Sequence, residues 1–198
     1  MAFDNKVIHT VVETTNVQAT KWAEHIYSMI NEVDDLDNGS IGFVGEIYDD
    51  TNDTYEFVKP TTALIAEGNP VMAIHPNDSF NFSILPEADE DQYFYNAKGD
   101  KFRAYTFMTG DKINISSTGI TPLNVGTGVV VGNYVTLTNA SYKLTETATK
   151  PTDKFYAKIE AINKYPFYVH DPMIKDNQGN VIIQRLKMIV LRIHNTRV

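Results

Sequence analysis

The sequence predicts a mainly β protein, an antiparallel barrel or sandwich with one N-terminal α-helix. Of its 198 residues, 42% are apolar and 11% are aromatic, a globular composition with a bias toward strands. After residue 38, short apolar runs alternate with turn signals, the pattern typical of all-β domains. Before residue 38, one segment has the spacing of an amphipathic helix.

The helix is expected within Thr15–Val33. Thr15 and Gln18 have the spacing of a capping box, which begins a helix. Apolar residues then recur at helical spacing and form one stripe, which consists of Trp22, Ile26, Met29, Ile30 and Val33. The run 34–42 ends the helix, because its acidic residues are unfavourable at the negative helix terminus and its Asn-Gly pair favours a turn.

The chain is therefore divided into residues 1–37, an N-terminal arm with the amphipathic helix, and residues 38–198, a β domain. Eight segments of the second part are expected to be strands, and they are 40–48, 54–59, 62–67, 101–108, 112–116, 128–138, 154–162 and 181–193. The last of them is apolar enough to be a central strand.

The tripeptide Gly-Asp-Lys occurs twice, at residues 99–101 and 110–112. A phosphate-binding loop needs a helix directly after its glycines, whereas each lysine here opens a strand-like run. We therefore expect Gly99 and Gly110 to lie at strand ends in turn conformations. The run Gly126–Gly132 has the wrong glycine spacing for a dinucleotide loop.

Charge and cysteine content exclude several classes of function. The net charge of −8 works against binding to nucleic acid or to an anionic membrane, because both need a positive surface. The absence of cysteine excludes disulfides, zinc–thiolate sites and thiol catalysis. The first fifteen residues hold no apolar run of signal-peptide length, so we expect synthesis in a cytoplasm.

No catalytic, cofactor-binding or metal-binding residue is assigned from the sequence, and an enzyme is not expected. The five histidines lack metal-ligand spacing, and no serine lies in a nucleophile elbow. The acidic runs 49–53 and 87–92 lack the calcium-loop spacing and are interpreted as solvated loops. Calcium binding at one of them stays open as an alternative.

The apolar stripe supplies the candidate partner-binding residues, which are Trp22, Ile26, Met29 and Ile30. A stripe of this kind is too apolar to be left in water, and a tryptophan is a typical anchor at protein interfaces. The alternative is that the stripe packs against the chain's own β domain.

Several segments together resemble a known family. The stretches "NGSIGFVGEI", "KGDKFRAYTFMTGDKINISS" and "VGNYVTLT", within about residues 38–165, resemble capsid decoration (auxiliary head) proteins of tailed bacteriophages from Gram-positive hosts. The resemblance implies a virion structural protein on the capsid surface, with the major capsid protein as its partner, possible self-association and assembly in the bacterial host cytoplasm.

Two departures from that family stand out, the long N-terminal helix and the stretch 165–180, which elaborates a C-terminal hairpin. Either is a candidate for holding a neighbouring protein. A tail, baseplate or fibre component remains an alternative. So does a carbohydrate-binding module, because the aromatic side chains of Lys164–Pro172 suit stacking on sugar rings.

Overall fold

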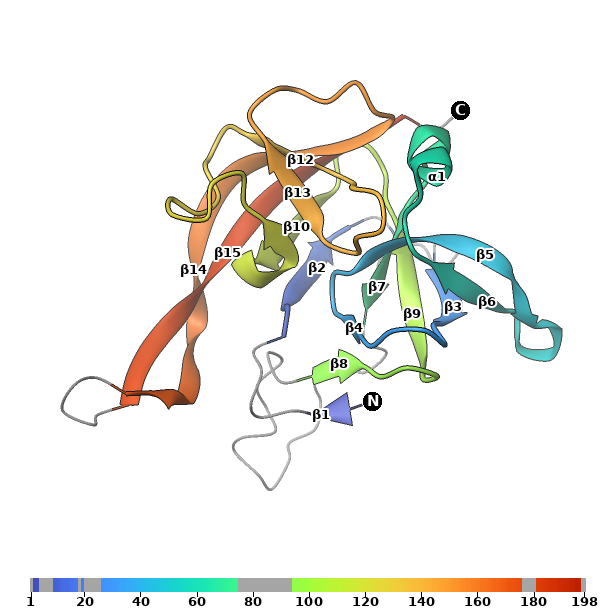
Figure 1. The fold of residues 1–198 in the computed structure, drawn as a ribbon, viewed down its shortest axis with the longest axis horizontal. Coiled ribbons are helices and arrows are strands. Elements are labelled where there is room, and N and C mark those ends of the chain that lie inside the picture. Colours follow the sequence, from blue (N-terminus) through green and yellow to red (C-terminus); the bar gives the residue numbers. More distant parts are fainter. Residues whose placement is uncertain are drawn as a thin grey trace.

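The prediction of a mainly β protein is confirmed. The structure, a computed structural model, describes residues 2–3, 9–17, 19, 26–74, 94–175 and 181–196. In this part of the chain the strands form a closed barrel, a seven-stranded sheet and a three-stranded sheet (Figure 1). The barrel and the seven-stranded sheet lie side by side and share a hydrophobic core.

The closed barrel has five strands, in the spatial order β3 (Ile26–Ile30), β6 (Thr54–Val58), β5 (Ile41–Asp49), β7 (Val71–Ile74) and β9 (Lys101–Thr106). Strand β9 closes the barrel by pairing antiparallel with β3, from Ile26 opposite Tyr105 to Ile30 opposite Lys101. The pair β3–β6 is parallel, and the other pairs are antiparallel.

Alternating side chains fill the barrel. On β9, Phe102 and Ala104 belong to the barrel interior, whereas Tyr105 belongs to the core shared with the seven-stranded sheet. A barrel of five strands is narrow, and a Cβ at Gly42 on β5 would lie 2.6 Å from the ring of Phe57. Glycine is therefore required there, as is common where a sheet bends sharply.

The seven-stranded sheet has the order β11 (Ile120–Thr121), β13 (Leu144–Thr147), β12 (Tyr134–Thr136), β14 (Phe155–Lys175), β15 (Val181–Asn195), β10 (Lys112–Ser116) and β2 (Val12–Asn16). The pair β11–β13 is parallel and the rest are antiparallel. Strand β15 lies inside the sheet, as its apolar sequence predicts.

Two phenylalanines join the barrel to this sheet. Phe107 follows β9 and Phe155 begins β14; both are buried, and their ring centroids lie 5.1 Å apart. Around them the barrel contributes Ile41 and Met72 to the same cluster, which the sheet completes with a row of aliphatic side chains.

Short elements complete the fold. The three-stranded sheet has the order β1 (Ala2–Phe3), β8 (Phe94–Asn96) and β4 (Leu36–Asp37). Two 3-10 turns, η3 (Asp50–Asn52) and η6 (Ser117–Gly119), and one α-helix, α1 (Thr62–Glu67), lie in the described residues.

Segment 62–67 was expected to be a strand, and this prediction is wrong because its flanking residues favour a helix. Thr61 accepts a hydrogen bond from the backbone N–H of Leu64, as an N-cap residue does. Gly68 has a φ of +82° and donates its N–H to the carbonyl of Leu64, which ends the helix.

The predicted N-terminal helix is also wrong, because Val12–Asn16 is strand β2 and Ile26–Ile30 is strand β3. Strand β3 is paired on both edges, and Met29 and Ile30 are both buried. A strand buried on both faces needs no alternation of polar residues, so its apolar run cannot be distinguished from a helical stripe by spacing. Residues before 38 thus contribute strands to the barrel and to both sheets.

The predicted turns at Gly99 and Gly110 are confirmed. Their φ angles are +81° and +99°, in the region that favours glycine. Each turn is also fastened, because Gly99 donates its N–H to the carbonyl of Asn31 and Gly110 donates to that of Ile193.

Strands β14 and β15 form a long hairpin that leaves the body of the protein (Figure 1). Strand β12 pairs with β14 over Tyr156–Lys158, and β10 pairs with β15 over Met188–Arg192. Beyond these rows, within the described residues, β14 and β15 pair as a two-stranded ribbon up to Lys175 opposite Val181. Three register shifts interrupt the ladder.

Candidate functional site

Three of the predicted partner-binding residues, Ile26, Met29 and Ile30, do not form an exposed surface. Met29 is 0% exposed inside the barrel, Ile30 is buried, and Ile26 is partly buried against the shared core. Trp22 lies outside the described residues. Of the two interpretations of the stripe, packing within the chain's own β fold is the one that these three residues follow.

Replacing Met29 by alanine should therefore lower the free energy of unfolding by about 2–5 kcal/mol, since it leaves a cavity in the barrel. Val33, which is 74% exposed, offers a matched control. Truncating it should change the free energy by no more than about 0.5 kcal/mol. Urea titrations of both variants measure the difference, and equal small effects would contradict the burial of Met29.

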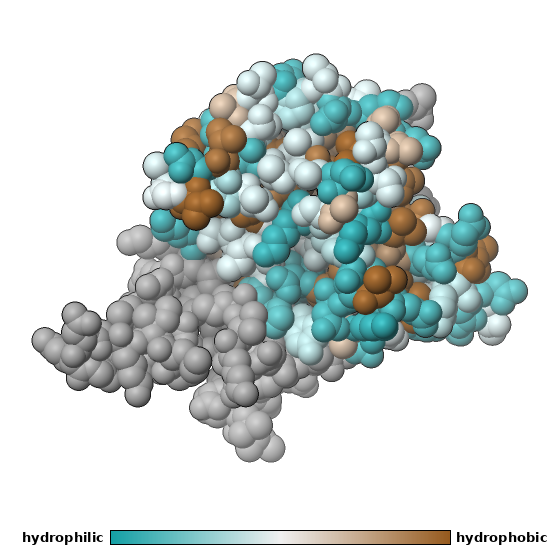
Figure 2. Space-filling view, viewed as in Figure 1, coloured by the Kyte–Doolittle hydropathy of each residue, from teal (hydrophilic) through white to brown (hydrophobic). Residues whose placement is uncertain are grey.

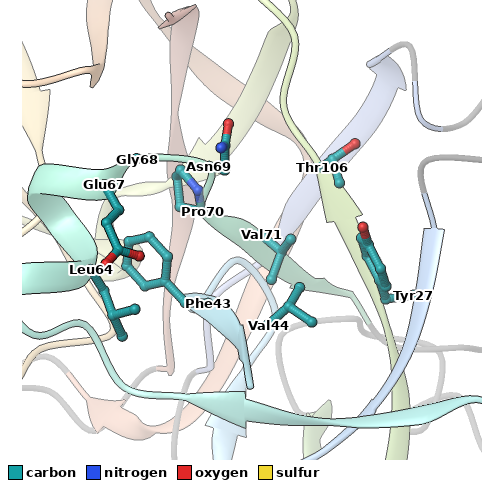
Figure 3. Close-up of a pocket in the computed structure, with 10 residues that line it drawn as sticks. All are labelled: Tyr27, Phe43, Val44, Leu64, Glu67, Gly68, Asn69, Pro70, Val71 and Thr106. Atoms are coloured by element: carbon teal, nitrogen blue, oxygen red, sulfur yellow. The ribbon is translucent and has the colours of Figure 1, made fainter. Parts of the chain in front are cut away.

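The open end of the barrel beside α1 holds a pocket of about 430 Å³ (Figure 3). It is lined by Tyr27, Phe43, Val44, Leu64, Glu67, Gly68, Asn69, Pro70, Val71 and Thr106. Four barrel strands contribute to this lining, and α1 with the chain after it forms the rim. We call this pocket the barrel mouth.

The barrel mouth has the volume of a small-molecule site. Barrel mouths are frequent ligand sites, and pockets of roughly 300–1,000 Å³ accept small ligands or side chains. The lining includes the apolar side chains of Phe43, Val44 and Val71, and Glu67 is its one charged residue (Figure 3). This arrangement suits an apolar group that carries a positive charge, and it offers no nucleophile with a base beside it.

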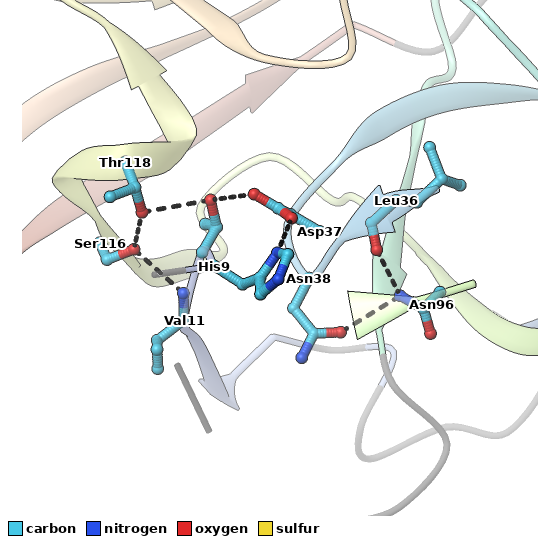
Figure 4. A network of polar contacts seen from close by, with 9 residues as sticks. His9, Val11, Leu36, Asp37, Asn38, Asn96, Ser116 and Thr118 are labelled. Atoms are coloured by element: carbon cyan, nitrogen blue, oxygen red, sulfur yellow. Dashed lines mark hydrogen bonds and ion pairs between the residues drawn. The ribbon is translucent and has the colours of Figure 1, made fainter. Parts of the chain in front are cut away.

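A polar network fastens the segment before β2 to its neighbours (Figure 4). His9 Nδ1 lies 2.6 Å from Asp37 Oδ1, and Thr10 donates its hydroxyl to Asp37 Oδ2 at 3.1 Å. The hydroxyls of Thr118 and Ser116 extend the network, and Ser116 Oγ accepts the backbone N–H of Val11.

The network resembles a catalytic triad only in its residue types. In a triad, the carboxylate binds one ring nitrogen of the histidine and the nucleophile binds the other. Here the hydroxyl groups connect to Asp37 itself, and His9 Nε2 is buried with no hydrogen-bond partner among the described residues. Burial alone would raise the pKa of Asp37, but hydrogen bonds from His9 and Thr10 outweigh it and the pKa is lowered. We interpret the network as structural.

In the acidic run 49–53, the first carboxylate, that of Asp49, is hydrogen-bonded within the protein. Asp49 accepts hydrogen bonds from the backbone N–H of Thr51, from the Asn52 amide and from Lys101 Nζ. Among the described residues no three histidine, aspartate or glutamate side chains gather in a way that could hold a metal ion. The run 87–92 lies outside the described residues.

One buried carboxylate organises a surface loop between β11 and β12. Glu146, on β13, is 2% exposed and accepts three hydrogen bonds, from the backbone N–H groups of Leu123 and Val130 and from the Asn133 amide. Burial opposes its ionised form, but these three donors outweigh that effect and lower the pKa of Glu146. The loop spanning residues 122–133, here called the neutral loop, is therefore anchored to Glu146 near both of its ends.

Sequence reasoning missed both the barrel mouth and the role of Glu146. The mouth is assembled from separate strands and leaves no local signal. The neutral loop had no signal of its own, because the whole run 113–142 lacks charged residues, and part of the loop was interpreted as the beginning of a strand at 128–138. The strand there is shorter, Tyr134–Thr136.

The described part of the chain contains no helix long and apolar enough to cross a membrane. Comparison with known proteins found no matching family model, curated protein or solved structure.

Proposed function

We propose that the chain is a virion structural protein that binds the outer surface of a tailed-phage head and stabilises the capsid lattice. The observation that carries the proposal is the ribbon of β14 and β15 beyond Asn163 and Met188. The segment resemblance to capsid decoration proteins supports it from the sequence.

Two physical properties of a two-stranded ribbon favour its use as an arm that binds another protein. An isolated hairpin is marginally stable in water, and its outer edges carry unpaired backbone groups that another chain can pair with. Natural proteins usually keep such edges short. A ribbon that extends well past its neighbours in the sheet therefore favours a partner that covers it, and we propose the major capsid protein.

Stabilisation follows from selective binding. If the chain binds only the expanded lattice, each bound copy shifts the equilibrium toward that lattice, because a ligand favours the state it binds. Such a function needs a compact body and a fitting contact surface, and it requires no catalysis.

The test uses a ribbon-shortened variant whose design follows the strand register. Lys164 lies opposite Lys187, so residues 165–186 can be replaced by Asn-Gly, which forms a tight two-residue hairpin turn. The full chain should sediment with purified expanded heads of the phage that encodes it. The shortened variant should keep the same circular dichroism and stay in the supernatant.

Two results would overturn the proposal. A full chain that remains in the supernatant would exclude head binding, and a shortened variant that binds as tightly as the full chain would exclude the ribbon as the arm. Immunogold labelling of virions addresses the tail or baseplate alternative, because label confined to the tail contradicts a head location.

A further inference from the structure

The barrel mouth is a cavity outside the proposed arm, because none of its described lining residues belongs to β14 or β15. Its walls are part of the packed protein. Phe43 and Val71 are buried, and Leu64 packs against the shared core. A pocket with such walls exists before a ligand enters, so little conformational entropy is lost on binding.

The mouth contains one charge that the protein does not balance. Among the described residues, the carboxylate of Glu67 takes part in no hydrogen bond or ion pair, and Lys154 donates only to its backbone carbonyl. A second cavity, of about 350 Å³, differs in this respect. There Asp37 already contacts His9, and Lys143 belongs to the same lining. The barrel mouth is therefore the cavity in which a negative charge is left for a ligand.

Aromatic and aliphatic side chains surround this charge. Figure 3 shows Phe43 and Glu67 on one side of the mouth and Tyr27 on the other, with Val44 and Val71 between them. Aromatic rings attract cations through their faces and also bury apolar groups. An anion would be repelled by Glu67, and a neutral apolar molecule would leave the carboxylate without a counter-charge. The lining thus selects a cation that carries an apolar group.

We propose that the barrel mouth binds a small organic cation, an arylammonium or alkylammonium ion. Its ammonium group lies beside Glu67, and its apolar part lies against Phe43, Val44 and Val71. The ligand is a free small molecule, because the volume of about 430 Å³ is in the range of small-molecule pockets. The net charge of −8 also attracts cations to the chain. This inference does not rest on head binding, and it is tested on the purified chain alone.

The probe is phenethylammonium, titrated into the ¹⁵N-labelled chain and followed by NMR. The amide signals of Gly68, Asn69 and Val71 should shift and saturate, with a dissociation constant on the order of 1 mM, usual for a ligand of this size. Phenethyl alcohol, which has nearly the same shape without the charge, should bind about three- to tenfold more weakly. Methylammonium, which has the charge without the apolar group, should give no saturable shift.

Glu67→Gln should weaken the binding of phenethylammonium by about three- to tenfold and leave that of phenethyl alcohol unchanged. Asp50→Asn is the matched control, because it removes one carboxylate at an exposed residue outside the lining and should change neither affinity. Circular dichroism checks that both variants are folded.

Four results would overturn the proposal. Absence of saturable shifts with phenethylammonium would exclude the site, and equal affinities for phenethylammonium and phenethyl alcohol would exclude the selection of a cation. Equal shifts with methylammonium would reduce the contact to an ion pair at the surface. Tighter binding of the amide of Nα-acetyl-lysine than of phenethylammonium would assign the mouth to a lysine side chain of another protein.

Discussion

Truncating Phe107 to alanine should lower the free energy of unfolding by about 3–5 kcal/mol. The side chain is buried where the barrel meets the seven-stranded sheet, and its ring packs against that of Phe155. Removing it leaves a cavity bordered by residues of both units. We therefore expect the barrel and the sheet to lose stability together.

Hydrogen exchange and urea titration measure this result. Amides of β9 and β14 should lose protection by the same free energy, and the urea transition should stay single and shift to lower concentration. Ile47→Ala, at an exposed position of β5, is the control and should change stability by no more than about 0.5 kcal/mol. Loss of protection in β9 alone would mean that the two units unfold separately.

Replacing Glu146 by alanine should cost about 2–3 kcal/mol, because hydrogen bonds to a buried charged group contribute about 1.5–3 kcal/mol and their donors then lack a partner. The donors at Leu123, Val130 and Asn133 all depend on this one carboxylate. Glu67→Ala removes an exposed glutamate on α1 and should be nearly neutral.

The contribution of Glu146 should also depend on pH. Its pKa in the folded protein lies below the ordinary value of 4.5, so its charge stabilises the fold at every pH above that value. As the pH falls from 4.5 through the lowered pKa, this stability is lost. The difference in unfolding free energy between wild type and Glu146→Gln should be constant near neutral pH and shrink on acidification. A difference that grows in acid would contradict the lowered pKa.

Several turns and strands were predictable because local chemistry specifies them. Gly99 and Gly110 each begin a Gly-Asp pair that favours a turn, and β9 alternates between exposed and buried residues from Lys101 to Ala104. Strand β3 was missed, because its neighbours in the barrel are distant in sequence and bury it on both faces. The capping residues of helix α1, Thr61 and Gly68, could have been recognised in the sequence. The apolar run between them, however, resembles a strand.

The candidate sites were harder to predict than the fold. A pocket such as the barrel mouth exists only once strands from four places in the sequence close a ring, so composition and spacing carry no trace of it. Glu146 looks like an ordinary polar residue between threonines. Its importance arises from burial beneath a loop about twenty residues earlier, a relation that periodicity does not encode.

The pairing of β2 with β10 and of β3 with β9 affects how the chain is made. At a synthesis rate of about 5–20 residues per second, β2 leaves the ribosome roughly 5–20 s before β10, whereas a hairpin forms in about 1–10 μs. Strand β3 can pair with β6 sooner, but its second edge stays unpaired until β9 has been synthesised. Folding during translation therefore passes through a stage in which early strands have open edges, and premature contacts between nascent chains on one messenger RNA become a hazard. The barrel closes only after β9 has been synthesised. A translational pause just before Lys101 should therefore favour aggregation. A pause after β10 should favour the native protein.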